Sequence, residues 1–170
     1  IIVFVNVAII HQSFVKSLPM PVSIGMEKPK SAVLGKDKLQ IAMDYLGCPK
    51  DRYKSIYEGI MIGSKAIGVD PVFILALLYT ESQFKLTAVS PKGYKGLMQT
   101  KTATMTFSDV DILHGCRMLE EKMKSRLAKT NGKVNMRTAL AMYKGGLNPM
   151  AFRQADEVLS LYNKLKSKGA

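Results

Sequence analysis

The residue best suited to chemistry in this chain is Glu81, which ends a strongly apolar stretch that begins at Asp70-Pro71. Asp is a favourable N-cap and Pro is tolerated in the first helical turn, so this pair predicts a helix start. Glu81 lies four residues after Leu77 and three after Leu78, which places it on the same helix face as core residues. A carboxyl group there loses hydration, and this loss favours its neutral form and raises its pKa. A general acid needs that form near neutral pH. The alternative is a glutamate at a helix end that points into water.

A polar loop follows Glu81 and favours the catalytic interpretation. Residues 88–99 read A-V-S-P-K-G-Y-K-G-L-M-Q, and Pro91, Gly93 and Gly96 indicate a backbone held in special conformations. Few sequences place one carboxylate in so apolar a setting and then build a polar loop beside it.

The glutamate and this loop together resemble the core of the SLT-type lytic transglycosylases, enzymes of the goose-type lysozyme superfamily that cut the glycan strands of bacterial peptidoglycan. Family members commonly read A-x-S-x-x-G-A-x-G-L-M-Q here. The chain matches this pattern at Ala88, Ser90, Gly93, Gly96, Leu97, Met98 and Gln99. The resemblance implies that Glu81 is the catalytic residue, that Ser90 lies near it, that Met98 packs against substrate sugar, and that Gln99 forms hydrogen bonds in the cleft.

Two of these implied roles have structural alternatives. Packing in the core is the commoner fate of a methionine such as Met98. The hydroxyl group of Ser90 could equally form a local hydrogen bond to the loop backbone.

The chain departs from the family pattern at Tyr94, where a small alanine is usual. After Gln99 relatives continue L-M-P-x-T-A, whereas this chain runs through Thr100-Lys101-Thr102-Ala103 and is two residues shorter. We therefore expect one wall of the cleft to differ.

Two further blocks resemble family motifs. Residues 111–119 are similar to N-I-x-x-G-x-x-Y-L, with Asp111 in place of an asparagine that could also cap a helix. Residues 141–146 look like the A-Y-N-A-G signature, with Lys144 in place of its asparagine. The resemblance implies that Tyr143 lies close to Glu81, and we expect its hydroxyl group to bind Glu81 or the reacting sugar. Successive helical residues point about 100° apart, so we expect Lys144 to point away from Glu81 into solvent.

The family mechanism implies that Glu81 protonates the glycosidic oxygen between N-acetylmuramic acid and N-acetylglucosamine. Its carboxylate then takes the proton of the muramoyl C6 hydroxyl group, which attacks the anomeric carbon and gives a 1,6-anhydro product. No metal or organic cofactor is needed. One alternative is a goose-type-like muramidase, a hydrolase for which Asp109 and Asp111 are the nearest candidates for a second carboxylate. Another is an inactive wall-binding or assembly protein, to which Lys144 and the shortened loop would point.

Helical periodicity predicts a mainly α, lysozyme-like domain over residues 31–170, since alternating strand patterns are nearly absent. The predicted helices are Lys38–Leu46, Arg52–Ile67, Asp70–Phe84, Asp109–Lys129, Arg137–Lys144 and Pro149–Lys166.

Residues 1–30 differ from the rest, because residues 1–10 are apolar and the following segment is rich in proline. Ten residues are too few to span a bilayer, and no positively charged segment precedes them. We expect an arm ordered on the domain or on a neighbour, with the remnant of a leader or a docking strand as alternatives.

The chain carries 25 basic and 13 acidic side chains, for a net charge of +12. A basic protein attracts polyanions such as the cell wall with its carboxylate-bearing peptides. The basic residues are scattered, without interleaved aromatic residues, so the sequence does not favour a nucleic-acid partner. The resemblance implies peptidoglycan as partner and an extracytoplasmic location, in the periplasm or cell envelope, either free or associated with the membrane. A compact catalytic domain also suits enzymes that open the wall for a secretion, pilus or phage machine.

The chain has two cysteines, Cys48 and Cys116, and two histidines, His11 and His114. Their spacing does not predict a metal site. The cysteines could pair as one disulfide outside the cytoplasm or remain two buried free thiols.

The net charge predicts that binding to intact peptidoglycan sacculi weakens as salt is added. Screening shortens the reach of surface charge to about 8 Å at physiological ionic strength. Co-sedimentation of the protein with sacculi over a salt series measures the effect. Binding that does not change with salt would mean that contacts in the cleft dominate.

Overall fold

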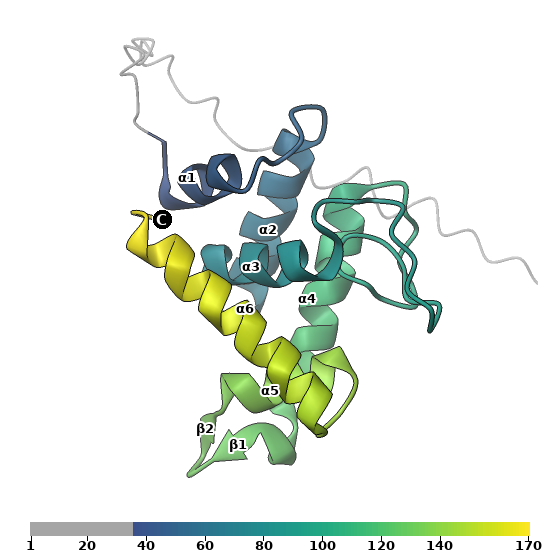
Figure 1. Ribbon diagram of the computed structural model, residues 1–170, viewed down its shortest axis with the longest axis vertical. Coiled ribbons are helices and arrows are strands. Elements are labelled where there is room, and N and C mark those ends of the chain that lie inside the picture. Colours follow the sequence, from purple (N-terminus) through teal and green to yellow (C-terminus); the bar gives the residue numbers. More distant parts are fainter. Residues whose placement is uncertain (1–35) are drawn as a thin grey trace, which may run out of the picture. The chain divides into compact units, whose positions relative to one another are not determined.

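The computed structural model describes residues 36–170, and this part of the chain is mainly helical (Figure 1). Its elements are α1 (Lys38–Tyr45), α2 (Tyr53–Ile67), α3 (Pro71–Ser82), α4 (Ser108–Lys124), the 3₁₀ helix η1 (Arg126–Ala128), β1 (Lys129–Thr130), β2 (Lys133–Val134), α5 (Met136–Lys144) and α6 (Pro149–Ser167). The prediction of a mainly α fold is confirmed. The arm predicted over residues 1–30 lies outside the described residues.

Helix α3 is the buried centre of this part of the chain, and α1, α2 and α6 contact it (Figure 1). Its residues from Val72 to Leu78 are all buried, which explains the absence of a polar face in the sequence. At its start, the Asp70 carboxylate accepts a hydrogen bond from Val72 N at 2.9 Å. At its end, Gln83 adopts a left-handed conformation, with φ 49°. The Arg52 guanidinium then donates to Phe84 O at 2.8 Å, which fixes the chain as it leaves α3.

Helix α6 anchors its C-terminal half to the start of α3. The Tyr162 hydroxyl donates to Asp70 at 2.9 Å, and the Lys166 ammonium lies 3.2 Å from the same carboxylate oxygen. The Tyr162 ring also meets Phe73 edge to face, with ring centroids 5.6 Å apart. Asp70 therefore caps α3 and also binds two side chains of α6.

The long loop between α3 and α4 is held by its own backbone and by one carboxylate. Lys95 and Thr100 exchange two backbone hydrogen bonds, each of 2.9 Å. Asp111 lies inside α4, fully buried, and its Oδ1 accepts from Thr104 N at 2.9 Å. The expectation that Asp111 caps α4 is wrong, because the helix begins earlier, at Ser108. Asp111 instead binds the loop to the helix, and it lies directly against Gly96.

The main difference from the predicted elements follows α4, which ends at Lys124 rather than at Lys129. A turn of 3₁₀ helix and a short antiparallel hairpin replace the last predicted turn. The hairpin reverses at Asn131-Gly132, both with positive φ (52° and 76°). Asn-Gly is the typical signal for such a turn, so the sequence did contain it.

Both described cysteines, Cys48 and Cys116, are buried free thiols. Burial raises the pKa of Cys48 to about 11 and that of Cys116 to about 12. The sequence left open whether the two cysteines form a disulfide or remain free thiols, and in the structure they are free thiols.

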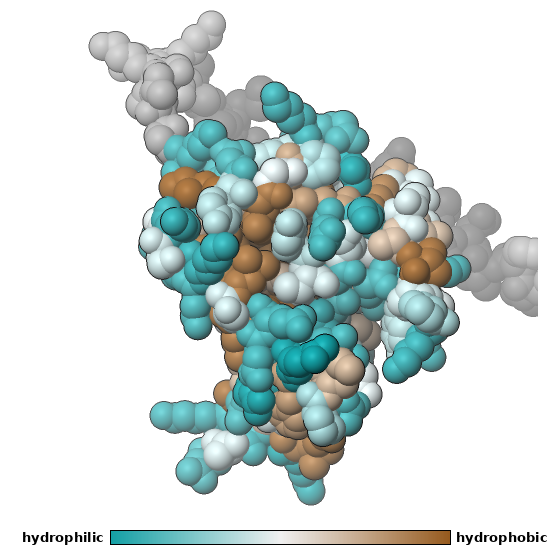
Figure 2. Space-filling view, in the orientation of Figure 1, coloured by the Kyte–Doolittle hydropathy of each residue, from teal (hydrophilic) through white to brown (hydrophobic). Residues whose placement is uncertain are grey.

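Most of the face seen in Figure 2 is hydrophilic, with apolar surface near the start of α6. Exposed apolar side chains next to that start include Leu147 and Met150. Within residues 36–170, no single helix has the length and apolar character needed to cross a membrane. The α2 and α3 pair meets the criterion together, but the two helices are bent by 118°.

The α2–α4 packing yields a prediction for Gly59→Ala. A Cβ atom at this position would lie 2.8 Å from Asp109 Cα, a backbone atom that no rotamer change can move. Alanine favours a helix over glycine by about 1 kcal/mol, but overpacking costs about 1–3 kcal/mol. We expect the melting temperature to fall by several degrees. A rise would show that intrinsic propensity dominates and that the helices separate freely.

Candidate active site

Glu81 lies in the last turn of α3, beside the C-terminal end of α5. Its side chain is 12% exposed, so the carboxyl group is almost buried but still reaches the surface. The expected desolvated glutamate is therefore present. The alternative, a glutamate pointing freely into water, does not fit this burial.

The Lys144 ammonium lies 2.9 Å from Glu81 Oε1, and its side chain is only 7% exposed. The prediction that Lys144 points into solvent is therefore wrong. The 100° rotation fixes where the Cβ atom of Lys144 points, but the flexible side chain beyond it reaches back to α3. The same ammonium donates to Thr80 Oγ1 at 3.2 Å, and Thr80 Oγ1 donates to Leu77 O at 2.9 Å.

Two opposing effects act on the Glu81 carboxyl group. Burial is the larger, and it raises the pKa of Glu81 above its ordinary value; the charge of Lys144 and its hydrogen bond lower that pKa. The net pKa remains raised, because the loss of hydration outweighs the single ammonium. Burial thus favours the protonated form of Glu81, while the Lys144 ammonium stabilises its ionised form.

Tyr143 lies close to Glu81, but its hydroxyl group binds elsewhere. It donates a hydrogen bond to Met98 O at 2.6 Å, and the side chain is buried. Burial first, and the Glu81 charge second, raise the pKa of Tyr143 well above its ordinary value. The expected hydrogen bond from Tyr143 to Glu81 is not formed. The tyrosine instead ties α5 to the loop.

Met98 is completely buried and belongs to the core. Its side chain packs directly on Gly115 of α4, where even a Cβ atom would collide with it. Of the two roles considered for Met98, the structure therefore supports packing in the core. In this conformation Met98 cannot contact a sugar.

Ser90 and Gln99 are engaged within the loop. Ser90 Oγ accepts from Tyr94 N at 3.0 Å, and Gln99 Nε2 donates to Ala88 O at 3.1 Å and to Gly96 O at 3.0 Å. Both side chains are half-buried. Their direct contacts with substrate stay a prediction, and their present role is to hold the loop beside α4.

Besides Lys144 and Tyr143, two residues have a role in the structure that the sequence analysis did not predict, Thr80 and Asp111. Thr80 is visible only as the neighbour of Glu81, and nothing in the spacing predicts its hydrogen bond to Lys144. Asp111 shares a helix face with Gly115, which is the one signal that it points inward.

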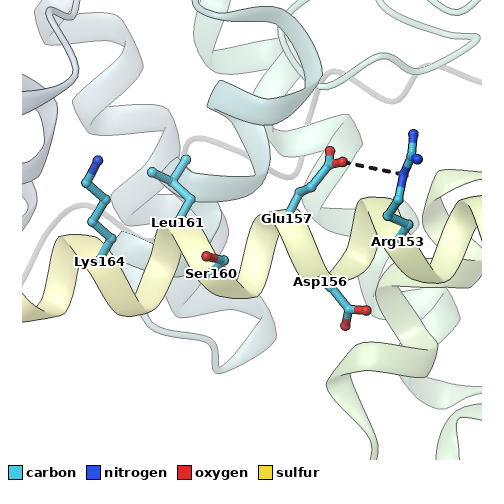
Figure 3. Close-up of a pocket in the computed structure, with 6 residues that line it drawn as sticks. All are labelled: Arg153, Asp156, Glu157, Ser160, Leu161 and Lys164. Atoms are coloured by element: carbon cyan, nitrogen blue, oxygen red, sulfur yellow. Dashed lines mark ion pairs between the residues drawn. The ribbon is translucent and has the colours of Figure 1, made fainter.

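Among residues 36–170, no group of three or more histidine, cysteine, aspartate or glutamate side chains is arranged to hold a metal ion. A hollow of about 480 Å³ lies along α6, away from Glu81 (Figure 3). Its lining comes from α6 alone, and three of its four charged side chains form ion pairs with neighbours on α5 or α6. Arg153 lies 3.9 Å from Glu157, while Asp156 binds Arg137 at 2.6 Å. The hollow along α6 does not have the convergent polar groups of an active site.

Comparison with protein families gives a match to the Transglycosylase SLT domain over residues 60–158, more than half of the chain. The chain belongs to the SLT transglycosylase family. The matched region contains Glu81, the loop that follows it and Tyr143, and the helical fold is consistent with the lysozyme-like fold of this family. A comparison with curated proteins finds no match.

Membership of the SLT family gives the buried glutamate a functional context. The family supports a lytic transglycosylase type of function and implies peptidoglycan as substrate. Within the SLT domain, Glu81 and Lys144 are the charged side chains that the structure brings together in an almost buried pair.

The pair leads to a prediction about pH. Removing the ammonium in Lys144→Asn leaves the burial effect unopposed, so the pKa of Glu81 should rise further. A general acid works below its pKa, and its activity is lost as pH rises through that value. We therefore expect the alkaline limb of the kcat/KM–pH profile to move to higher pH.

Lys144→Arg is the matched control, because it keeps the positive charge; its alkaline limb should stay near that of the wild type. An unmoved limb in Lys144→Asn, or one moved to lower pH, would contradict the coupling between Lys144 and Glu81.

Proposed function

We propose that this protein is a peptidoglycan lytic transglycosylase in which Glu81 acts first as acid and then as base. The observation that carries the proposal is the burial of this single carboxyl group, with a raised pKa, inside the region matched to the SLT domain. A protonated carboxyl at the edge of a buried helix is a group that can protonate a leaving oxygen.

The proposed reaction needs one carboxyl group and no water. Glu81 gives its proton to the glycosidic oxygen as the bond to the muramoyl anomeric carbon breaks. The C6 oxygen of the same sugar then bonds to that carbon, and its proton passes to the Glu81 carboxylate. The 1,6-anhydro ring forms and Glu81 ends protonated, ready for another turnover.

Lys144 affects both halves of this cycle. It reduces the fraction of enzyme in which Glu81 is protonated, but it stabilises the carboxylate that forms once the proton has left. The Lys144 ammonium therefore makes Glu81 a stronger acid, but it also lowers the fraction of enzyme in which Glu81 is protonated before the reaction. Burial has the larger effect of the two, so the pKa of Glu81 stays above its ordinary value despite the nearby ammonium.

A hydrolase that uses Glu81 with water has two candidate second carboxylates, Asp109 and Asp111. Asp109 lies half-buried in the first turn of α4, and Asp111 is unsuitable. Asp111 is fully buried and bound to the Thr104 backbone and hydroxyl group. A carboxylate in that position cannot activate a water molecule on the face of a sugar.

A binding role without catalysis is supported by the 2.9 Å pair itself, because Lys144 favours the ionised form of Glu81. In that case the wild type would bind sacculi and release no muropeptides. We place the protein outside the cytoplasm, where its substrate lies. Cooperation with a secretion, pilus or phage assembly fits a compact wall-opening domain.

The decisive experiment is mass analysis of the products released from purified peptidoglycan. The proposal predicts muropeptides with a 1,6-anhydro end, each lighter by one water than the product of hydrolysis. Reducing ends in their place would favour the hydrolase.

Glu81→Gln should abolish this release, because the amide cannot transfer a proton. Positioned acid–base catalysis contributes about 10²–10⁴-fold, and we expect a loss at the upper end because one residue performs both transfers. The substitution also leaves Lys144 without a counter-charge, so its melting temperature should be compared with that of the Glu81→Gln/Lys144→Asn double variant. Near wild-type turnover in either folded variant would refute the assignment.

A further inference from the structure

A second concave site lies between the long loop and the outer face of α4, and it includes neither Glu81 nor Lys144. It is a pocket of about 340 Å³. The lining residues that bear on its chemistry are Tyr94, Thr100, Lys101, His114, Arg117 and Glu121.

Two of the lining residues each have a buried polar atom that finds no hydrogen-bond partner among residues 36–170: Thr100 Oγ1 and His114 Nδ1. The whole Thr100 residue is only 3% exposed. Leaving a buried polar group unsatisfied costs about 1–3 kcal/mol. Two such atoms in the wall of one pocket indicate a ligand group that could bind both once the side chains rotate, since a hydroxyl group and the Nδ1–H tautomer of an imidazole are both donors.

The charged side chains of the pocket favour an anion. Lys101 and Arg117 are exposed, and among the described residues neither forms an ion pair. The Lys101 ammonium lies 5.7 Å from the centre of the Tyr94 ring, which holds it beside the pocket. Glu121 contributes one opposing charge, so the lining keeps an excess of one positive charge.

The loop side of the pocket is ordered before any ligand arrives. The two backbone hydrogen bonds between Lys95 and Thr100 fix the backbone that carries the Thr100 side chain. Gln99 holds the same turn through Ala88 O and Gly96 O. A site ordered in advance loses less entropy on binding.

The pocket also forms where the chain departs from its family pattern. Tyr94 replaces the usual alanine, and Thr100 and Lys101 belong to the segment that is two residues shorter. These departures bring a ring, a hydroxyl group and a cation to one place.

We propose that this pocket is a recognition site for a carboxylate of the peptides attached to the glycan strand. Arg117 and Lys101 pair with the carboxylate, and rotation of the Thr100 and His114 side chains brings Oγ1 and Nδ1 to the pocket surface, where they donate hydrogen bonds to it. This inference rests on the proposed function, because it takes peptidoglycan as the polymer that the protein binds.

A direct binding test is independent of catalysis. The full chain is titrated with a free stem peptide that lacks sugar, and binding is followed by NMR at residues 94–102 and at His114. Arg117→Gln should weaken binding about 10-fold or more, the effect expected for one charge-assisted hydrogen bond. Lys92→Gln is the matched control, since Lys92 is an exposed cation of the same loop outside the pocket.

Several results would overturn the proposal. One is an equal loss of affinity in Arg117→Gln and Lys92→Gln; another is a peptide that perturbs neither segment. Inorganic phosphate that binds as tightly as the peptide would show a general anion site instead. If Arg117→Gln does not fold, Lys101→Gln replaces it in the same comparison.

A kinetic test separates this inference from the proposed function. Arg117→Gln should raise KM on peptide-bearing strands with kcat unchanged, and should behave as the wild type on strands whose peptides have been removed. An equal rise in KM on both substrates would refute peptide recognition. A wild type that cleaves neither substrate would refute the proposed function, while the peptide titration would still decide the role of the pocket.

Discussion

The almost buried ion pair between Glu81 and Lys144 is the interaction around which the rest of the site is arranged. Its two charges lie 2.9 Å apart and join the end of α3 to the end of α5. Breaking a buried pair by removing one partner typically costs about 3–5 kcal/mol. The pair thus links the position of the candidate acid to the packing of two helices, so that catalysis and stability depend on one contact.

The surrounding fold holds both ends of this contact. Helix α3 is surrounded by other helices, so the direction of Glu81 is fixed by packing from several sides. On the other side, Tyr143 donates to Met98 O, and Met98 packs on Gly115. This chain of contacts runs from α5 through the loop to α4. The residues that the family pattern marks as substrate contacts therefore serve here to hold the site together.

The sequence predicted the helices and the buried glutamate well, because both depend on local spacing of apolar residues. The prediction from sequence failed where the role of a residue depends on a long, flexible side chain or on contacts between segments far apart in the chain. A helical wheel gives the direction of the Cβ atom of Lys144 but not of its ammonium group, which reaches Glu81 through a flexible side chain. The inward position of Asp111 depends on Thr104 and Gly96, which approach α4 only in the folded chain. The early end of α4 was predictable, since Asn131-Gly132 favours a hairpin turn.

Two of the departures from the family pattern add positive charge to regions that, on the proposed function, bind a strand with anionic peptides. Lys144 brings an ammonium to the acid, and Lys101 brings another to the edge of the shortened loop. Near Glu81 such a charge opposes protonation, so the site tolerates it only because burial has the larger effect on the pKa. The pocket at the loop does not include Glu81, the acid whose protonation Lys101 would oppose, and the proposed role of this cation is to bind substrate. Attraction of an anionic substrate requires positive charge, whereas protonation of Glu81 is opposed by positive charge nearby. The two requirements therefore conflict within the same domain. On the proposed function, their separation into a buried pair and an open pocket would let this chain meet both.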